Sequence, residues 1–309
     1  MNVFCTIINK KYIPYAIVLC RSLQKFIPQI HFHAAIVDAA PGEDYPPVAG
    51  LEFIPVSAVV ETEIAQKIFQ KYAHTNQDHL RWALKPVLLL HLLRKHDQMI
   101  FVDPDVYFTG DPSFLFEELA AHDILLAPHW SEIRPLRYED GLFSVMRNGI
   151  YSGGFIGANR RSVPALEWWA EVCHYKMDES REMGVFVDQK YLDLFPLLLE
   201  NAGIIRHPGC NLTNINLLTC VRTMENGRLR INGSFEPVFI HFTRDTIFNI
   251  DKGNDPLLVE YLNQYRKELK EAGYEVGTGP ILSFYEPIKR KFLLRTRLKR
   301  FFFRLAENI

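Results

Sequence analysis

The sequence predicts an α/β fold, in which a parallel or mixed sheet carries helices on both faces. In the first hundred residues, apolar segments typical of buried strands alternate with segments whose apolar residues recur at helical spacing. One of these strands, 98–103, runs directly into two carboxylates, Asp103 and Asp105. Ligands of such sheets bind along the edge formed by the carboxyl ends of the strands, so the fold also predicts where a functional site would lie.

The first half of the chain supplies the alternating elements. The expected helix at 79–95 contains Pro86, which either interrupts it or starts its second part. The expected strands are 2–8, 31–38, 51–56 and 98–103, and the expected helices are 11–26, 58–73 and 79–95.

The second half is more mixed. Short strands are expected at 123–128, 153–158, 229–233 and 237–242, and amphipathic helices at 162–176 and 255–269. Residues 129–148 show little periodicity, so they are predicted to form a loop that can act as a lid. No linker, repeat or low-complexity tract divides the chain, and one domain is expected over 1–285.

Composition and charge exclude several classes of protein. The net charge of −1 is uneven, because 288–305 carry only basic charges and the rest of the chain is acidic, which is not typical of a general nucleic-acid-binding protein. The five cysteines are odd in number and form no CxxC pair, which favours the reducing cytosol over a disulfide framework. No signal peptide and no apolar stretch of bilayer length is recognised, so a cytoplasmic location is expected.

The Asp103-Pro104-Asp105 segment is the strongest chemical signal. A carboxylate at the end of a buried strand is unfavourable unless a cation or hydrogen bonds compensate it. Two Asp separated by one residue in an extended chain point to the same side, which suits Mg²⁺ or Mn²⁺. A metal held there can neutralise a departing diphosphate. The alternative is an ordinary turn, because Asp and Pro are common turn residues.

A second enzyme class has a similar sequence motif. Haloacid dehalogenase-like phosphatases carry an apolar strand followed by Asp-x-Asp-x-Thr or Val. Here Tyr107 occupies the fifth position, and the motif lies a third of the way along the chain rather than near its start. A phosphatase is therefore kept as a minor alternative.

Several motifs, taken in order, resemble bacterial nucleotide-sugar glycosyltransferases of the GT-A fold. The nearest likeness is to the family-eight-like retaining enzymes, which include lipopolysaccharide galactosyltransferases and glycogenin. The motifs span residues 2–243 and are "WALKPVLLLHLL", "FVDPDVYF", "NGIYSGGFIGANR", "LEWW", "FVDQKYLDLFP", "HPGCNLTNINL" and "FIHF". Each is modest alone, but their order and spacing are fairly specific. The resemblance implies a Rossmann-like mixed sheet flanked by helices.

The resemblance also implies a metal site. Asp103 and Asp105 match metal ligands, or metal and ribose contacts, and His241 matches the third protein ligand. Without the resemblance, a histidine among aromatic residues is more often a core residue. Imidazole suits Mn²⁺ better than Mg²⁺, so Mn²⁺ is the expected cofactor and Mg²⁺ the alternative.

By resemblance, the nucleotide base lies at the first strand and the turn after it. Thr6 and Asn9 would hydrogen-bond the base and Tyr12 would stack on it. The alternative is a helix cap at Asn9 with a core aromatic behind it. Lys85 matches a basic position that faces the donor sugar or diphosphate. Its alternative is a solvated helix lysine, and Arg81, one turn earlier, could share or take the role.

Further residues are expected around the sugar. Gly153 and Gly154 let a backbone approach a ligand closely, with a plain β-bulge as the alternative. Ser152 stands where the related enzymes often have Asn, which leaves its contact to the sugar open. By resemblance, Asp188 binds sugar hydroxyls, although locally it reads as a helix N-cap. Gln189 would lie near the reacting carbon, on the face where a retaining enzyme stabilises an oxocarbenium-like state.

The residues expected to contact the acceptor and the diphosphate match those of the related enzymes less well. Asn211 would help to shape the acceptor side, with Asn214 and Asn216 as companions. The related enzymes often follow the His with a Gly and a Lys-Pro-Trp-like segment that grips the diphosphate. This chain has "HFTRDTIFNIDKGND" instead, in which Arg244 and Lys252 are the candidates.

Residues 286–309 predict a basic amphipathic segment. As a helix it would gather apolar side chains on one side and arginines on the other, which suits an anionic bilayer surface. The alternative is a terminal helix docked on the protein. The apolar residues are Leu294, Leu298, Phe301, Phe302 and Leu305, and the arginines are Arg297, Arg300 and Arg304. The protein is thus expected to be peripheral on the inner face of the cytoplasmic membrane.

These expectations combine into one predicted function. The protein would transfer a hexose from a nucleotide diphosphate sugar, UDP-linked, to a glycan or glycolipid such as a lipopolysaccharide, with a metal and with retention. The alternatives are a sugar nucleotidyltransferase, a haloacid dehalogenase-like phosphatase, or a non-catalytic protein that binds a nucleotide or glycan. The expected partners are the donor, the acceptor and an anionic membrane surface, without nucleic acid.

Overall fold

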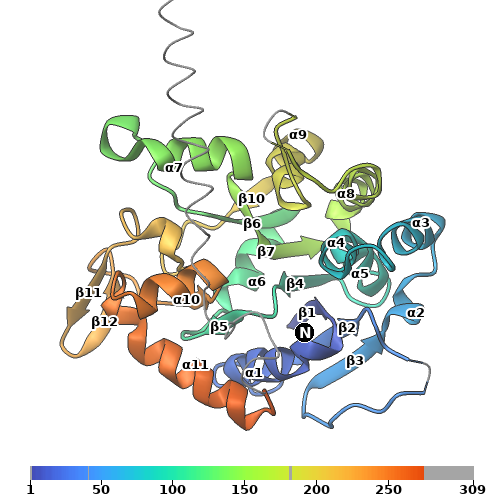
Figure 1. The fold of residues 1–309 in the computed structure, drawn as a ribbon, viewed down its shortest axis with the longest axis horizontal. Helices are drawn as coiled ribbons and strands as arrows, with labels where there is room; N and C mark the ends of the chain where they lie inside the picture. Colours follow the sequence, from blue (N-terminus) through green and yellow to red (C-terminus); the bar gives the residue numbers. More distant parts are fainter. Residues whose placement is uncertain (1, 41, 181–182, 275–309) are drawn as a thin grey trace, which may run out of the picture. The chain divides into compact units, whose positions relative to one another are not determined.

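A seven-stranded sheet forms the centre of the molecule in this computed structural model (Figure 1). The structure describes residues 2–40, 42–180 and 183–274. The strand order is β10-β6-β7-β4-β1-β2-β3, and β7 is antiparallel to both of its neighbours whereas the other pairs are parallel. The strands are β1 (Val3–Ile8), β2 (His31–Ile36), β3 (Leu51–Pro55), β4 (Gln98–Val102), β6 (Ile124–Pro128), β7 (Tyr151–Asn159) and β10 (Ala202–Ile204). The sheet is therefore mixed, as predicted.

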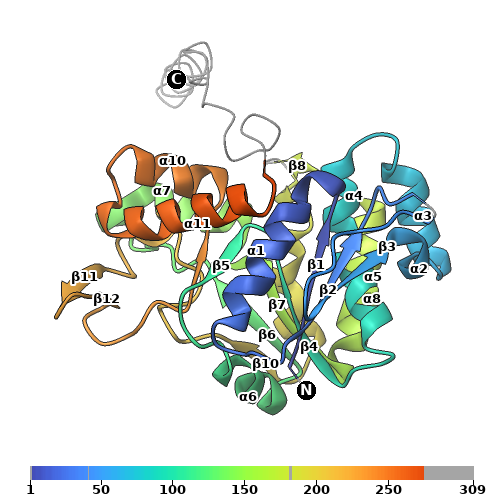
Figure 2. The ribbon, with the colours of Figure 1, turned by 90° about the horizontal axis from the view of Figure 1, so that it is seen from below.

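Helices cover both faces of this sheet (Figures 1 and 2). The alternation along β1 shows why: Cys5 packs into the core on one face, and Phe4 into the core on the other. One face carries α2 (Val56–Val59), α3 (Glu63–Tyr72), α4 (Gln77–Ala83), α5 (Lys85–Leu92) and α8 (Val163–Tyr175), and the other carries α1 (Ile13–Gln24) and α6 (Phe114–Ala121). Helices on both faces explain why the strands read as nearly continuous apolar runs.

A small second sheet brings the late part of the chain back to the Asp103–Asp105 turn. Strand β5 (Val106–Phe108) follows that turn and pairs antiparallel with β13 (Phe239–His241), so that His241 stands opposite Val106. Around this sheet lie the hairpin of β11 (Arg222–Glu225) and β12 (Arg228–Ile231), α10 (Arg244–Asp251), and α11 (Val259–Glu271), which packs against α1 (Figure 2).

The remaining short elements connect these parts. They are the 3₁₀ helices η1 (Lys10–Tyr12), η2 (Arg160–Ser162), η3 (Gln189–Leu194), η4 (Asn214–Asn216) and η5 (Pro256–Leu258), the helix α9 (Phe195–Leu198), and the strand pair β8 (Glu179–Ser180) and β9 (Val185–Phe186). Residues up to Tyr274 form one compact unit.

Two of the expected helices are divided. The segment 58–73 breaks before α3, because the Thr62 side chain accepts a hydrogen bond from the Ala65 backbone and caps a new helix. The segment 79–95 breaks at Leu84, and Pro86 stands in the first turn of α5, where its missing N–H costs no hydrogen bond.

The prediction of a loop over 129–148 is wrong, because α7 (Pro135–Asn148) occupies most of it. This helix kinks at Tyr138, whose φ and ψ are −158° and 90°. Gly141 is its one buried residue, and Leu136, Phe143 and Met146 are exposed. These apolar residues do recur at helical spacing, but Gly141 is a poor helix former and the kink at Tyr138 interrupts the helix, so the segment resembles a loop in sequence.

Within the described ranges, the structure contains no helix with both the length and the apolar character needed to cross a bilayer. The predicted basic segment 286–309 and the last part of the expected domain 1–285 lie outside the described residues.

Candidate active site at the carboxyl edge of the sheet

The candidate site lies where the strand order changes direction. Strand β1 has β2 on one side and β4 on the other, so the loops after β1 and β4 leave the sheet on either side of a crevice. Asn9 follows β1, Asp103 follows β4, and the antiparallel β7 begins at the same edge with Tyr151. Residues far apart in the sequence are thereby brought to one edge.

Three side chains at this edge form a group that can hold a metal ion. One ligand atom each from Asp103, Asp105 and His241 lies within 4.8 Å of the other two. Asp103 is held by its backbone N–H, which donates to the carbonyl oxygen of Gly154 at 2.9 Å. His241 comes from β13, which pairs with the strand that follows Asp105. The sequence predicted this trio, and the structure brings it together.

A histidine–carboxylate pair links two members of the trio. The His241 Nε2 atom lies 3.0 Å from Oδ1 of Asp105. Burial opposes the charged form of each side chain, but each partner outweighs burial in the other, so the pKa of His241 is raised and that of Asp105 is lowered. His241 can bind a metal only as the neutral ring. A divalent cation bound here would therefore replace the imidazole proton as the positive charge beside Asp105.

Lys85 is a buried cation between two carboxylates. Its Nζ atom lies 3.2 Å from Asp103 and 3.1 Å from Asp188, and it donates to the carbonyl oxygen of Gly153 at 2.8 Å. Burial lowers the pKa of Lys85, but the two aspartates raise it further, so the ammonium stays charged. The alternative of a solvated helix lysine is excluded, because the side chain is 3% exposed.

Asp188 and Gln189 stand at the start of η3. The side chain of Asp188 makes no cap hydrogen bond and instead points at Lys85, so it is not an N-cap in function. Burial raises its pKa, and Lys85 lowers it only in part. Gln189 accepts a hydrogen bond from the Gly153 backbone at 2.9 Å and donates to the carbonyl oxygen of Asn148 at 2.9 Å. Its amide thus ties β7 to the end of α7.

The two glycines of β7 make room for the site's own side chains. A Cβ atom on Gly154 would lie 2.5 Å from Cε1 of His241 and 3.1 Å from Oδ2 of Asp103. On Gly153 it would meet Gln189, Asp188 and Lys85 at 3.3 to 3.5 Å. Ser152 is buried, and its hydroxyl accepts a hydrogen bond from the Gly154 backbone at 3.2 Å. Glycine is needed here for close packing of the strand against the trio.

The residues predicted to receive a nucleotide base lie along the end of β1. Thr6 is fully buried and Asn9 is 7% exposed, yet Oγ1 of Thr6 and Oδ1 of Asn9 have no hydrogen-bond partner among the described residues. Asn9 occupies the N-cap position of η1 without a side-chain cap bond, so the cap alternative fails. Among the residues that the structure describes, both atoms therefore lack a hydrogen bond that a polar ligand could supply, although other buried side chains, such as Tyr265, also lack one.

Tyr12 already has a partner on its ring. The guanidinium carbon of Arg81 lies 4.4 Å from the ring centroid, and Nη2 of Arg81 pairs with Asp78 at 2.6 Å. Burial raises the pKa of Tyr12 to about 12, against the effect of Arg81. Arg81 therefore covers one face of the Tyr12 ring, and a base that stacks on Tyr12 would have to use the other face.

The Asn211 region forms the wall beside β6. Asn211 is buried with φ of 62°, and its side-chain amide donates to the carbonyl oxygen of Pro128 at 3.1 Å. Asn216 donates to the carbonyl oxygens of Asn211 and His129, and Asn214 accepts from the Thr246 hydroxyl. These amides hold the loop in place, so in this structure they shape the site rather than point freely into it.

Of the two candidates for the diphosphate, Arg244 lies nearer to the trio. It is the first residue of α10, directly after the Thr243 N-cap and three residues after His241, and it is exposed. Lys252 follows the other end of this eight-residue helix, about 12 Å away along its axis, and lies over the ring of Phe248. The helix N-terminus adds a partial positive charge on the Arg244 side.

Sequence reasoning missed His129. It follows β6, and its ring nitrogens are buried. Burial, and then the charge of His241, lower the pKa of His129 to about 4, so the ring is neutral at pH 7. The signal was available, because His129 directly follows the apolar run "ILLAP", as Asp103 follows "MIFV".

Comparison with known proteins gives distant relatives. No family model matches the chain. Two curated proteins of Bacillus subtilis (strain 168), both described as uncharacterized, are similar in sequence. YfnF is 26% identical over 264 residues, which cover 81% of this chain and 84% of YfnF. YfnD is 24% identical over 259 residues, which cover 79% of this chain and 78% of YfnD.

Comparison with solved structures identifies the fold. The chain is similar to the galactosyltransferase LgtC in complex with donor and acceptor sugar analogs, with a TM-score of 0.56 and 14% identity over 94% of this chain and 99% of that one. An active-site mutant of LgtC gives a TM-score of 0.50 at 14% identity, over 78% of this chain and 87% of that one. The chain therefore has the GT-A fold, and the predicted fold class is confirmed.

Proposed function

We propose that this protein is a glycosyltransferase that moves a hexose from a nucleotide diphosphate sugar to a glycan or glycolipid. The observation that carries the proposal is the trio of Asp103, Asp105 and His241 at the carboxyl edge of a GT-A sheet, with Lys85 and Asp188 directly behind it. A solved structure of the same fold holds donor and acceptor sugar analogs.

The trio fits a divalent cation. Two carboxylates and one imidazole are oxygen and nitrogen donors that suit Mn²⁺, with Mg²⁺ as the alternative. When bound, the cation would neutralise charge on the diphosphate as it leaves. The chain supplies the geometry for this by holding Asp103 through the Gly154 carbonyl and by keeping a Cβ atom away from His241.

The donor would lie along β1 and the trio. The unpartnered atoms of Thr6 and Asn9 would bind the edge of the base, for which we propose uracil, and Tyr12 would pack against its ring. Arg244 would contact the diphosphate from the start of α10. Lys85 would keep Asp103 and Asp188 in place, and it lies close enough to the trio to stabilise developing phosphate charge.

The sugar would lie over Asp188, Gln189 and the two glycines. The Asp188 carboxylate would accept hydrogen bonds from sugar hydroxyls, and Ser152 would line the same wall. Gln189 would lie near the reacting carbon, where a polar side chain can stabilise an oxocarbenium-like state, and we propose retention of configuration. Asn211 would shape the side that the acceptor approaches.

A screen of nucleotide sugars tests this proposal. With Mn²⁺ present, one donor should be hydrolysed to free sugar and nucleoside diphosphate, and Asp103→Ala, Asp105→Ala and His241→Ala should each lower the rate at least about a hundredfold, as loss of metal-site residues does. Asp97→Ala is the matched control, because this exposed aspartate lies before β4, at the opposite end of the same strand. Full manganese-dependent hydrolysis in all three variants would contradict the assignment.

The products separate the remaining alternatives. A nucleotidyltransferase would release or consume pyrophosphate, and a phosphatase would release inorganic phosphate. A non-catalytic nucleotide- or glycan-binding protein would bind the donor without turnover. Release of a nucleoside diphosphate together with the sugar is expected only of a glycosyltransferase among these classes.

We propose further that the basic residues at 286–309 hold the enzyme at the inner face of the cytoplasmic membrane, near a lipid-linked acceptor such as a lipopolysaccharide precursor. The support is the sequence alone, with eight basic and no acidic residues over 288–305. Removal of 289–309 should reduce co-sedimentation with vesicles that contain anionic lipid. Equal binding with and without these residues would refute the membrane role.

A further inference from the structure

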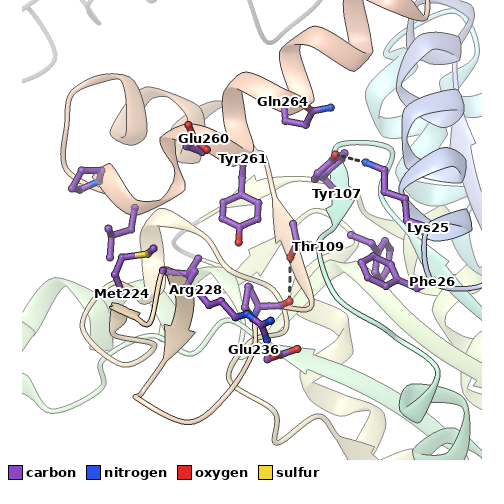
Figure 3. A pocket seen from close by; sticks show the side chains of 16 residues that line it. Lys25, Phe26, Tyr107, Thr109, Met224, Arg228, Glu236, Glu260, Tyr261 and Gln264 are labelled. Atoms are coloured by element: carbon purple, nitrogen blue, oxygen red, sulfur yellow. Dashed lines mark hydrogen bonds between the residues drawn. The ribbon is translucent and has the colours of Figure 1, made fainter.

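A large cavity lies away from the candidate active site. Its volume is about 860 Å³, within the range of about 300–1,000 Å³ typical of small-molecule sites. It lies between β5, the β11–β12 hairpin, α11 and the last residues after α1 (Figure 3). Lys25 lines it from the end of α1, whereas Tyr12 precedes the start of that helix, about 18 Å away along twelve residues. None of the trio residues, nor Lys85 or Asp188, lines the cavity, so the two sites are distinct, although the lining residue Tyr107 stands only two residues after Asp105.

The wall on the α1 side is fixed by hydrogen bonds. Nζ of Lys25 lies 2.8 Å from the Tyr107 hydroxyl and 2.7 Å from Glu268, and the Tyr107 hydroxyl donates to the same carboxylate at 2.9 Å. Thr109 donates to the carbonyl oxygen of Pro237 at 3.2 Å. These bonds hold this wall in place without a ligand, so a ligand would spend little binding energy on ordering it.

Aromatic rings and free polar groups meet inside the cavity. The ring of Tyr261 projects from α11 into its centre, and Phe26 lies on the α1 side (Figure 3). Within the described part of the chain, the Tyr261 hydroxyl, the Arg228 guanidinium and the Glu260 carboxylate have no hydrogen bond or ion pair from their side chains, whereas Glu236 is paired with Arg230. Arg228 and Glu260 are exposed, so a ligand would exchange the water at these groups for its own donors and acceptors.

The charges in the lining balance. Lys25 and Arg228 are cationic, and Glu236 and Glu260 are anionic. A polyanion such as a nucleic acid, or an anionic lipid headgroup, would meet as much repulsion as attraction here, and so would a strongly basic peptide. The lining therefore favours a ligand without net charge.

We infer that this cavity binds an uncharged oligosaccharide. Each sugar hydroxyl both donates and accepts, so a sugar can use Arg228, Glu260 and the Tyr261 hydroxyl together. The C–H faces of a sugar ring can pack on the faces of Tyr261 and Phe26, where aromatic side chains provide most of the binding energy. The inference goes beyond the proposed function, because such binding does not require transfer.

The test is calorimetric titration of the full-length protein with short neutral gluco-, galacto- and manno-oligosaccharides. Saturating Mn²⁺ and uridine diphosphate are present, so that the donor part of the candidate active site is occupied, and the Tyr261 variant distinguishes binding in the cavity from binding on the acceptor side. At least one series should bind, and Tyr261→Ala should weaken that binding about tenfold or more, as loss of a central aromatic contact does. Tyr175→Ala is the matched control, because Tyr175 ends α8 and is 77% exposed.

A double substitution tests the requirement for an uncharged ligand. Arg228→Gln with Glu260→Gln keeps hydrogen-bonding groups and removes one charge of each sign, so binding of a neutral sugar should change less than about threefold. Neither Tyr261→Ala nor this double variant should change donor hydrolysis, because none of these residues lies at the trio. The inference of sugar binding and the proposed activity can therefore be refuted independently of each other.

Three outcomes would overturn the inference. One is the absence of binding by every neutral series in the protein with an occupied active site. Another is an equal loss of affinity in Tyr175→Ala and Tyr261→Ala, since the sugar would then bind elsewhere. The third is displacement of the neutral sugar by a charged oligosaccharide or peptide that binds more tightly, since the cavity would then serve a different class of ligand.

Discussion

Lys85 is the residue on which the charge balance of the candidate site depends. It is buried between Asp103 and Asp188, and its removal leaves two carboxylates facing each other without a cation. We expect Lys85→Met to lower the free energy of unfolding by about 3–5 kcal/mol, as does the loss of one partner from a buried ion pair. Urea denaturation followed by circular dichroism measures this change.

Two further variants show whether charge is the cause. Lys67→Met removes an exposed lysine paired with Glu63, and it should cost at most about 0.5 kcal/mol. Lys85→Met combined with Asp188→Asn should be less destabilised than Lys85→Met alone, because one of the unpaired charges is gone. If the double variant were the less stable of the two, packing rather than charge would be the role of Lys85.

Gly154 sets the distance between β7 and the trio. A Cβ atom there would lie 2.5 Å from the His241 ring, and the ring would have to move. We therefore expect Gly154→Ala to weaken Mn²⁺ binding at least about tenfold, as do changes that misplace a metal ligand. Gly153→Ala, with its nearest contact at 3.3 Å, should have the smaller effect. Electron paramagnetic resonance of Mn²⁺ in the presence of uridine diphosphate measures both, and equal affinities in the two variants would count against a constraint by Gly154.

At the level of the elements, α5 packs its apolar side chains into the core, whereas α7 leaves most of its apolar side chains exposed. Leu136 on α7 is fully exposed, whereas Leu88 on α5 is fully buried. Leu136→Ala should change the free energy of unfolding by no more than about 0.5 kcal/mol, and Leu88→Ala should lower it by about 2–5 kcal/mol. Thermal or urea unfolding of the two variants gives the comparison. A large loss in Leu136→Ala would show that α7 packs its apolar residues in solution.

Three histidines near the junction of β2, β3 and α5 should make the free energy of unfolding depend on pH. Burial lowers the pKa values of His33, His91 and His96, and Glu52 and Glu61 oppose this only in part. Below the usual histidine pKa of 6.5 the unfolded chain binds protons that the folded chain does not. These histidines therefore contribute fully to the free energy of unfolding above pH 6.5, and this contribution is lost as the pH falls through their pKa values in the folded state.

The corresponding variant is His33→Gln. It removes one of these titrating groups, so the free energy of unfolding should fall less steeply below pH 6.5 than in the unchanged protein. His74→Gln is the matched substitution at an exposed position outside this junction. Urea titrations over a series of pH values measure the slopes, and the same slope in His33→Gln as in the unchanged protein would contradict the assignment.

For the molecule as a whole, the sequence predicted the sheet and the two aspartates of the trio because both depend on local patterns. Apolar runs of strand length specify β1, β2 and β4, and a polar residue directly after such a run marks the edge where ligands bind. Family resemblance supplied His241, whose local sequence is typical of a core residue. The register of β13 against β5 then explains why this histidine reaches Asp105.

What could not be predicted depends on contacts between distant segments. Arg222 is buried, donates to the carbonyl oxygens of Thr213 and Asn216, and lies 3.3 Å from Asp255, yet it stands in a polar stretch without a motif. Helix α7 was missed because Gly141 and the kink at Tyr138 interrupt it, and because its apolar residues, although at helical spacing, lie mostly on the surface. Such features become visible only when the segments that pack together are known.

The pairing of β13 with β5 has a consequence for protein synthesis. Asp105 and His241 are 136 residues apart, so a chain emerging from the ribosome exposes both aspartates long before the histidine is made. Until then the ion proposed for this site lacks a ligand, and the proposed transfer of sugar cannot begin. Capture of the ion would thus coincide with completion of the fold, and release of the ion would be an early sign that β13 has detached.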